Sequence, residues 1–359
     1  MRGPFVQLAD TALGALKYFW QDAPEYAVVA GGSLLGVEVR RKNIFVPVGC
    51  IDIERILPLS FEEFLLNSQP KLFEAIQEVR IEKPVPDFVI PTLERELRKY
   101  QTVGGMPAAV SAYLDNQSIE EVDEILKNIL AMYRLDFSQY ATATEAMRIS
   151  QVWDSLPAQL AKEKTRFAYN IVAKGAKARE YKPALQWLVD AGLIMEIKRV
   201  STPNLPLKAY VESDIFKIYA TDLGLLRVLS NMSASVLFQP VETFKEFKGA
   251  MAENMIALAL FRQYQTEPNY WTSKAQAEVD FLIQHDVSVL PIEVKAGESI
   301  RGKSLGVYCD KYEPPVALRF SQRGLLLNGK ILNIPHYLAE SSRRLLDTSG
   351  LLPTDFFSL

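Results

Sequence analysis

Residues 277–295 read AEVDFLIQHDVSVLPIEVK, two apolar runs on either side of a polar stretch at 284–286. Apolar runs of this length are typical of strands, and a short polar interruption is typical of a turn. We therefore expect an antiparallel hairpin. With the turn centred on 286–287, facing residues have numbers that add up to 573, so Asp280 faces Glu293. Facing residues of such a pair have Cβ atoms roughly 5 Å apart.

Strand alternation divides the hairpin side chains between two faces. Asp280 and Glu293 are expected to share one face with Lys295, which lies two residues beyond Glu293. The opposite face is expected to carry the apolar side chains of Val279, Phe281, Ile283, Ile292 and Val294.

Two facing carboxylates raise each other's pKa unless a cation lies between them, and Mg²⁺ is a hard cation that prefers oxygen ligands. Such a metal polarises a phosphodiester and generates hydroxide, while the Lys295 ammonium would orient the water or stabilise negative charge. Glu253 lies in the strongly helical stretch 249–260 and would add an outer ligand from a helix packed on the sheet. The pattern predicts catalytic Asp280, Glu293 and Lys295, and a metal site of Asp280, Glu293 and Glu253.

This order and spacing resembles the PD-(D/E)XK pattern of metal-dependent nucleases of the restriction-endonuclease type. The alternative interpretation is a solvated strand face on which Asp280, Glu293 and Lys295 form cross-strand ion pairs.

Composition limits the class of protein, its partners and its location. The chain has 359 residues, of which 48% are hydrophobic and 23% charged, which is typical of a globular protein with two or three domains. The net charge of -3 means that any contact with nucleic acid must come from a local basic patch. Cys50 and Cys309 lie far apart without a metal or redox spacing, and the sequence has no secretory leader or long apolar run. We expect a cytoplasmic protein without membrane contact.

The first part of the chain, residues 1–84, contains a helical pattern at 11–20 and an apolar run at 26–30 that predicts a short buried strand. Ser60 and Glu63 have the spacing of a helix capping box. The proline-spaced stretch 84–91 predicts a loop and a domain boundary near residue 85.

The middle part, residues 85–235, is mostly helical and contains a predicted winged helix at about 149–211. Helices at 149–160, 171–176 and 179–191 precede strands at 193–197 and 207–211, which flank a turn-rich segment at 201–206. Basic residues gather here, with Tyr169 and Tyr181 among them: Lys162, Lys164, Arg166, Lys174, Lys177, Arg179 and Lys182.

This basic cluster predicts contact with a DNA backbone through Lys174, Lys177, Arg179 and Lys182. Winged helices also dock proteins, and charged helix faces are often simply solvated, so both alternatives stay open.

A second motif, residues 297–304, matches the Walker A pattern with Gly297, Gly302, Lys303 and Ser304. A phosphate-binding loop normally opens a nucleotide domain, whereas only 55 residues follow this motif. The strand before it is already the second arm of the hairpin. We therefore interpret the motif as a chance match and do not expect ATP to bind.

The whole chain resembles a group of prokaryotic AAA-superfamily ATPases that end in a winged helix and a restriction-endonuclease-like domain, whose C-terminal part is of uncharacterised function. The resemblance is carried by the segments 16–19, 23–26, 31–36, 47–49, 58–65, 104–107, 179–181, 184–188, 190–194, 278–281 and 292–295. It implies an α/β multidomain protein: a partial P-loop-type α/β remnant at 1–84, a helical and winged-helix middle at 85–235, and a restriction-endonuclease-like α/β domain at 236–359.

One departure from the family concerns the nucleotide site. Family members carry Walker A and Walker B motifs before the segment that matches 13–19, and without gaps the Walker B Asp-Glu pair would fall on Pro4 and Phe5. Neither side chain can hold magnesium. The chain looks N-terminally truncated, and we expect no ATPase activity from it alone.

Two hypotheses follow. The chain is a DNA-associated, nuclease-like protein with a competent Mg²⁺ site, or it is a non-catalytic binding or regulatory protein, including half of a split ATPase that acts with a separate ATP-binding subunit. An unpaired sheet edge at 26–30 would also favour self-association.

Overall fold

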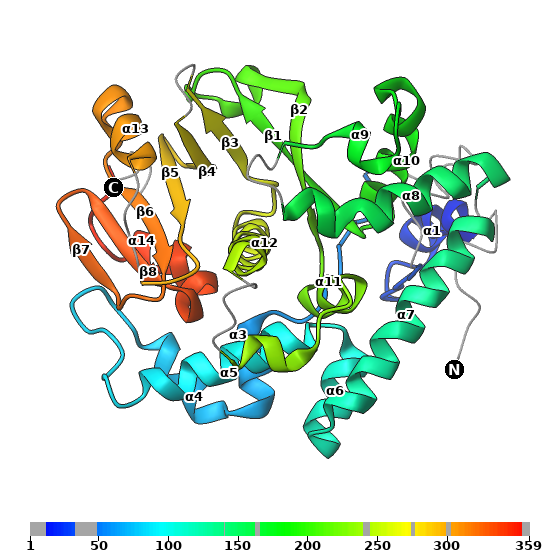
Figure 1. Cartoon of the computed structure of the whole chain (residues 1–359). Coiled ribbons are helices and arrows are strands. Elements are labelled where there is room, and N and C mark those ends of the chain that lie inside the picture. Colours follow the sequence, from blue (N-terminus) through cyan, green and yellow to red (C-terminus); the bar gives the residue numbers. More distant parts are fainter. Residues whose placement is uncertain are drawn as a thin grey trace.

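The structure, a computed structural model, describes residues 12–32, 49–139, 141–161, 166–239, 245–273, 277–298 and 303–353. It is a mixed α/β protein in which a helical N-terminal region precedes a C-terminal eight-stranded mixed sheet (Figure 1). None of the helices in these ranges is both long and apolar enough to cross a membrane.

The described helices before residue 143 are α1 (Ala12–Asp22), α3 (Phe61–Ser68), α4 (Pro70–Gln77), α5 (Ile90–Val103), α6 (Pro107–Asn116) and α7 (Ile119–Gln139). The predicted capping box opens α3: the Glu63 N–H donates to Ser60 Oγ at 3.0 Å, and the Ser60 N–H donates to Glu63 Oε2 at 2.7 Å. These bonds satisfy backbone donors that the first helical turn leaves free.

The expected winged helix consists of α8 (Ala143–Leu160), α9 (Tyr169–Val172), α10 (Ala178–Asp190), β1 (Ile194–Val200) and β2 (Val211–Ala220). The three helices and the antiparallel strand pair occur in the predicted order. The middle helix ends earlier than expected. The expected second strand at 207–211 is wrong except for its last residue, because 207–210 form the 3-10 helix η2 (Leu207–Tyr210) and β2 begins at Val211.

The remaining strands are β3 (Asn269–Thr272), β4 (Glu278–His285), β5 (Ser288–Val294), β6 (Ala317–Ser321), β7 (Leu326–Asn328) and β8 (Ile331–Pro335). The remaining helices are α11 (Leu223–Leu229), η3 (Ala234–Leu237), α12 (Lys245–Tyr264), α13 (Ser304–Tyr312), η5 (His336–Ser341) and α14 (Ser342–Asp347). The strand order is β2-β1-β3-β4-β5-β6-β8-β7. Because β1 pairs with β3 in parallel, one sheet crosses the boundary that the sequence predicts at 235/236.

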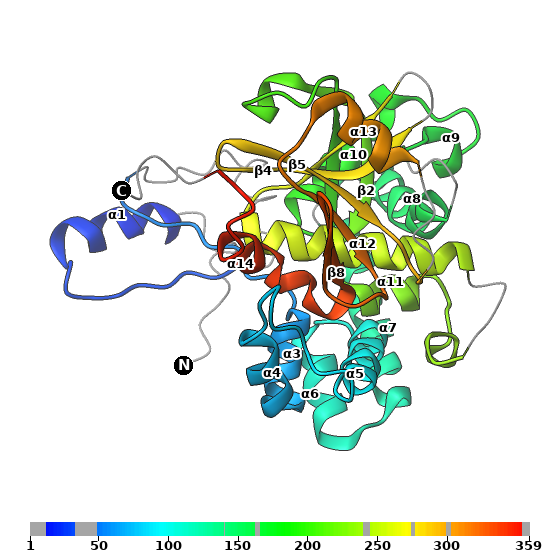
Figure 2. The same cartoon turned by 90° about the vertical axis from the view of Figure 1, so that its left-hand side faces the viewer.

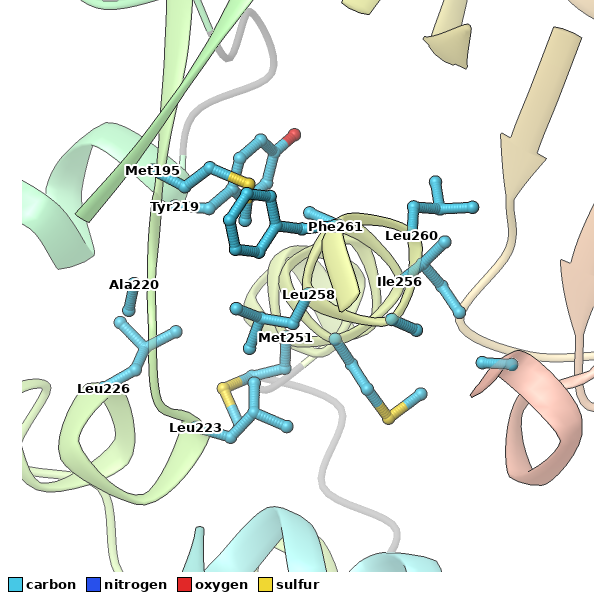
Figure 3. Packing of buried hydrophobic residues seen from close by; sticks show 14 of the residues in the cluster. Met195, Tyr219, Ala220, Leu223, Leu226, Met251, Ile256, Leu258, Leu260 and Phe261 are labelled. Atoms are coloured by element: carbon cyan, nitrogen blue, oxygen red, sulfur yellow. The ribbon is translucent and has the colours of Figure 1, made fainter. Parts of the chain in front are cut away.

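Helix α12 forms the centre of the core, and the sheet arches around it (Figure 1). Its residues 250–261 are buried except for the half-buried Glu253, as expected for a helix segment enclosed by protein. Figure 3 looks along this helix, with Phe261 beside Met195 and Tyr219 and with Met251 beside Leu223. On the other face of the sheet, α13 contributes Tyr308 to a second, smaller apolar cluster.

The predicted hairpin register is confirmed: the pairs from Phe281–Ile292 to His285–Ser288 all have numbers that add up to 573. The β3–β4 pairing contains an irregularity that the sequence did not predict. Asn269 pairs with Leu282 but Trp271 pairs with Val279, so β4 has one extra residue in this interval, which is a β-bulge.

The predicted strand at 26–30 is wrong, because these residues form no regular structure and Val29 is 95% exposed. A strand needs a neighbour for its backbone donors and acceptors, and none of the described strands pairs with it. The predicted helix at 11–20 is confirmed as α1, which projects away from the sheet (Figure 2). Residues 33–36 of the segment 31–36, which carries part of the family resemblance, lie outside the described residues.

Candidate functional site

Asp280 lies on β4 at the bulge, where β4 and β5 separate. The backbone N–H of Val294 donates to Asp280 Oδ2 at 2.7 Å. This β5 N–H is therefore bonded to a side-chain carboxylate of β4 and not to a backbone carbonyl of β4. Burial and, after it, the negative charge of Glu253 raise the pKa of Asp280 to about 7. The Lys217 ammonium and the Val294 N–H act in the opposite direction.

Glu253, Glu278 and Asp280 form what we call the acidic cluster, which surrounds the ammonium of Lys217. Lys217 Nζ lies 2.5 Å from Glu278 Oε1, and the side chain is only 1% exposed. Burial alone would lower the pKa of Lys217, but Glu253, Glu278 and Asp280 together raise it. The Tyr219 hydroxyl donates to Glu253 Oε2 at 3.0 Å. The cluster is therefore built around a cation that the protein itself supplies.

Glu293 belongs to a different group of charges, which we call the Glu293 ion pair. Arg319 Nε donates to Glu293 Oε2 at 2.8 Å, and Lys295 Nζ lies 3.1 Å from Glu293 Oε1. Glu293 is only 4% exposed and lies directly opposite Arg319 in the β5–β6 pairing. This buried carboxylate is therefore neutralised by a guanidinium on the next strand.

The expectation that Asp280 and Glu293 share one face is wrong in this structure. The bulge places Val279 with Leu282 in the cluster near α13, and Asp280 beside Glu253 of α12. Glu293 acts electrostatically on Cys309 of α13, which places it on the other face of the sheet. A bulge reverses the alternation on one strand only.

The structure thus brings Asp280 together with Glu253, and Glu293 together with Lys295, as two separate groups. Among the residues that the structure describes, no three His, Cys, Asp or Glu side chains have a geometry that could hold a metal ion. The catalytic and metal-binding roles of Asp280, Glu293, Lys295 and Glu253 remain predictions.

Sequence reasoning missed Lys217, Glu278 and Arg319. The sequence does contain a signal for Lys217, because this residue interrupts the apolar end of β2. A buried ammonium at such a position needs a carboxylate partner. The pairing of Glu293 with Arg319 had no local signal, because it depends on the parallel alignment of β5 with β6.

The predicted DNA-binding residues Lys174, Lys177, Arg179 and Lys182 are all exposed, on or just before α10. One of them, Lys182, lies 3.5 Å from Asp214 in an exposed ion pair. In contrast, Tyr181 is buried, and the predicted cluster members Lys162 and Lys164 lie outside the described residues.

In the Walker A match, Ser304 begins α13 and its Oγ accepts from the Glu278 N–H at 3.3 Å. Ser304 therefore links α13 to β4. Lys303 is exposed, and Gly297 lies in the bend that follows β5. Gly302 lies outside the described residues.

Two segments that carry the family resemblance meet in space. The Leu59 N–H donates to the Gly105 carbonyl at 2.7 Å, and a Cβ at Gly105 would lie 2.1 Å from the Leu59 carbonyl oxygen. Only glycine permits this approach. Arg262 of α12 donates to the Pro58 carbonyl at 2.8 Å and pairs with Glu340 at 3.0 Å. These segments therefore fasten the N-terminal helices to α12.

Comparisons with known proteins match two parts of the chain. Residues 94–236 match the model of a Domain of unknown function (DUF8612). Residues 248–337 match the model of another Domain of unknown function (DUF4143), a domain often found with AAA ATPases. No curated protein and no solved structure matches the chain.

Proposed function

We propose that this chain is a DNA-associated binding protein, related to AAA-family ATPases, whose nuclease-like C-terminal site does not cut DNA. The observation that carries this proposal is that each expected metal ligand already lies beside a cationic side chain. Glu293 is paired with Arg319 and Lys295, and the acidic cluster surrounds Lys217.

A metal at Glu293 would have to displace Arg319, whose side chain is only 10% exposed. Breaking a buried ion pair and leaving one charge without a partner costs about 3–5 kcal/mol. A divalent cation at Glu293 has to overcome this penalty before it gains any binding free energy.

Exposed basic residues support the association with DNA. Lys174, Lys177, Arg179 and Lys182 are exposed and lie within nine residues of one another, on a chain whose net charge is -3. A local cluster of basic residues can bind the phosphate backbone without any overall positive charge.

A second candidate function, Mg²⁺-dependent endonuclease, is favoured by the crowding of Asp280 and Glu253. Their mutual repulsion and burial raise the pKa of Asp280 to about 7. A divalent cation would relieve this repulsion and displace the proton. For a metal ion to bind there, the ammonium of Lys217 would have to move away from the acidic cluster.

The two candidates are separated by calorimetric titration of Mg²⁺ or Mn²⁺ into the wild-type chain and into an Asp280→Ala, Glu293→Ala double variant, followed by a plasmid-nicking assay on both. The binding proposal expects duplex DNA to bind both proteins, with no nicking by either. Metal binding and nicking that disappear in the double variant would replace it with the nuclease.

The partner that we propose is a separate ATP-binding subunit or a second copy of the chain. This proposal rests on α1, where Tyr18 and Trp20 are exposed. Large exposed apolar side chains that lie close together are typical of interaction surfaces. Light scattering on the purified chain measures self-association directly: a monodisperse monomer that remains stable on storage excludes the second copy.

A further inference from the structure

A cavity of about 560 Å³ lies between α5, η3, α12 and η5. This volume is within the range of about 300–1,000 Å³ that small-molecule sites have. Its wall combines apolar side chains, among them Leu97, Phe238 and Met251, with the polar side chains of Lys248 and His336.

The cavity lies at the joint between the two parts of the chain that match family models. Glu94 and Val236 are the first and last residues of the earlier matched segment, and Lys248 and Tyr337 are the first and last residues of the later one. All four line the cavity. Such joints are preferred positions for ligand sites. None of its lining residues belongs to the acidic cluster or to the Glu293 ion pair.

His336 is the most deeply buried polar side chain of the wall, with 7% exposure. Burial and the positive charge of Lys248 lower its pKa to about 4, so the ring is neutral at neutral pH. Backbone hydrogen bonds to Phe320 and Lys295 act in the opposite direction. Its Nε2 has no hydrogen-bond partner among the described residues. A buried polar atom of this kind favours a ligand that can donate a hydrogen bond.

Lys248 supplies the available positive charge. It is exposed and forms no ion pair with any other residue that the structure describes. The other lining cation, Arg98, is already paired with Glu94 at 3.9 Å. Glu298 also lines the cavity, where its carboxylate would accept a hydrogen bond from a donor on the ligand.

We propose that this cavity binds a small organic anion, whose acid group pairs with Lys248 and whose apolar body packs against Leu97, Phe238 and Met251. This site is independent of the proposed DNA association and of the candidate nuclease site.

The test uses two fluorescent probes of similar shape, the anionic anilinonaphthalene sulfonate and the neutral phenylnaphthylamine. In Lys248→Gln we expect the affinity for the anionic probe to fall about fivefold, the effect of one partly exposed ion pair. The affinity for the neutral probe should stay within about twofold, because the apolar wall is unchanged.

Leu237→Trp places a larger side chain in the cavity from the half-buried residue 237 of η3, and should weaken the binding of both probes. The exposed Lys330→Gln, which does not line the cavity, is the matched control and should change neither affinity. If both cavity variants melt like the wild type and bind both probes with unchanged affinity, the proposal is wrong. An equal loss of affinity for both probes in Lys248→Gln would also overturn the proposal, because the charge of Lys248 would then play no part in binding.

Discussion

The acidic cluster and the Glu293 ion pair come from the same hairpin, yet they balance buried charge in opposite ways. The acidic cluster has three carboxylates around the one ammonium of Lys217. The Glu293 ion pair has one carboxylate between two cations. An excess of buried carboxylates is relieved by taking up a proton, and Asp280 has the raised pKa that this requires. We therefore expect the acidic cluster to respond to pH and to cations, and the Glu293 ion pair to respond to neither.

The largest effect is expected from Arg319→Ala, which leaves the buried carboxylate of Glu293 with only Lys295 as a partner. The free energy of unfolding should fall by about 3–5 kcal/mol, as for other buried ion pairs that lose one member. Urea denaturation measures it. Adding Glu293→Gln in the same chain removes the charge that lost its partner and should restore part of the stability; a double variant less stable than Arg319→Ala would contradict the assigned pairing.

A smaller loss is expected from Lys217→Met, which removes the cation of the acidic cluster. Glu278 is about one-third exposed, so water screens part of the remaining repulsion, and the loss should be about 2 kcal/mol. Lys217→Arg keeps the charge and is the matched control. Thermal melts with and without Mn²⁺ sharpen the comparison: the metal should raise the melting temperature of Lys217→Met and leave that of Arg319→Ala unchanged.

The pH dependence should be carried by Asp280. Its folded-state pKa of about 7 lies above the unfolded value of 3.8, so the folded protein binds the proton more tightly. Stability therefore falls as pH rises from about 4 to 7, and Asp280 should account for about 2 kcal/mol of loss between about pH 5 and pH 8. Asp280→Asn keeps an acceptor for the Val294 N–H but cannot titrate. Its unfolding free energy should be flatter over this range, and an unchanged pH profile would refute the assignment.

The smallest effect concerns the exposed basic residues on and just before α10, which belong to neither of the two buried groups. Replacing Lys177 and Arg179 by Gln should weaken duplex DNA binding about tenfold at low salt. The slope of the logarithm of affinity against the logarithm of salt concentration should also fall by the contribution of about two phosphate contacts. Fluorescence anisotropy at several salt concentrations measures both quantities. Lys71→Gln and Lys127→Gln, in the helices outside the winged helix, form the control; equal losses in the two pairs would remove the winged helix as the DNA-binding surface.

The sequence predicts those features that depend on short-range pattern. The hairpin register follows from its turn and its apolar runs, and the capping box at Ser60 follows from the spacing of two residues. The bulge at Asp280 could not be predicted, because it arises from the pairing of β4 with β3. The same reason hid the carboxylate partners of Lys217, which it reaches only because β1 and β2 join the later strands. The apolar run at 26–30 has the composition of a strand but lacks a neighbouring strand in the described part of the chain.

The parallel pairing of β1 with β3 also determines how the protein can be divided. A fragment that starts at residue 236 would lose β1 and β2, which cover one edge of β3 and one side of α12. That edge would present free backbone donors and acceptors to other chains, a common origin of aggregation. Hydrogen exchange should accordingly protect β1, β3 and α12 to the same extent, because these elements open together as one cooperative unit.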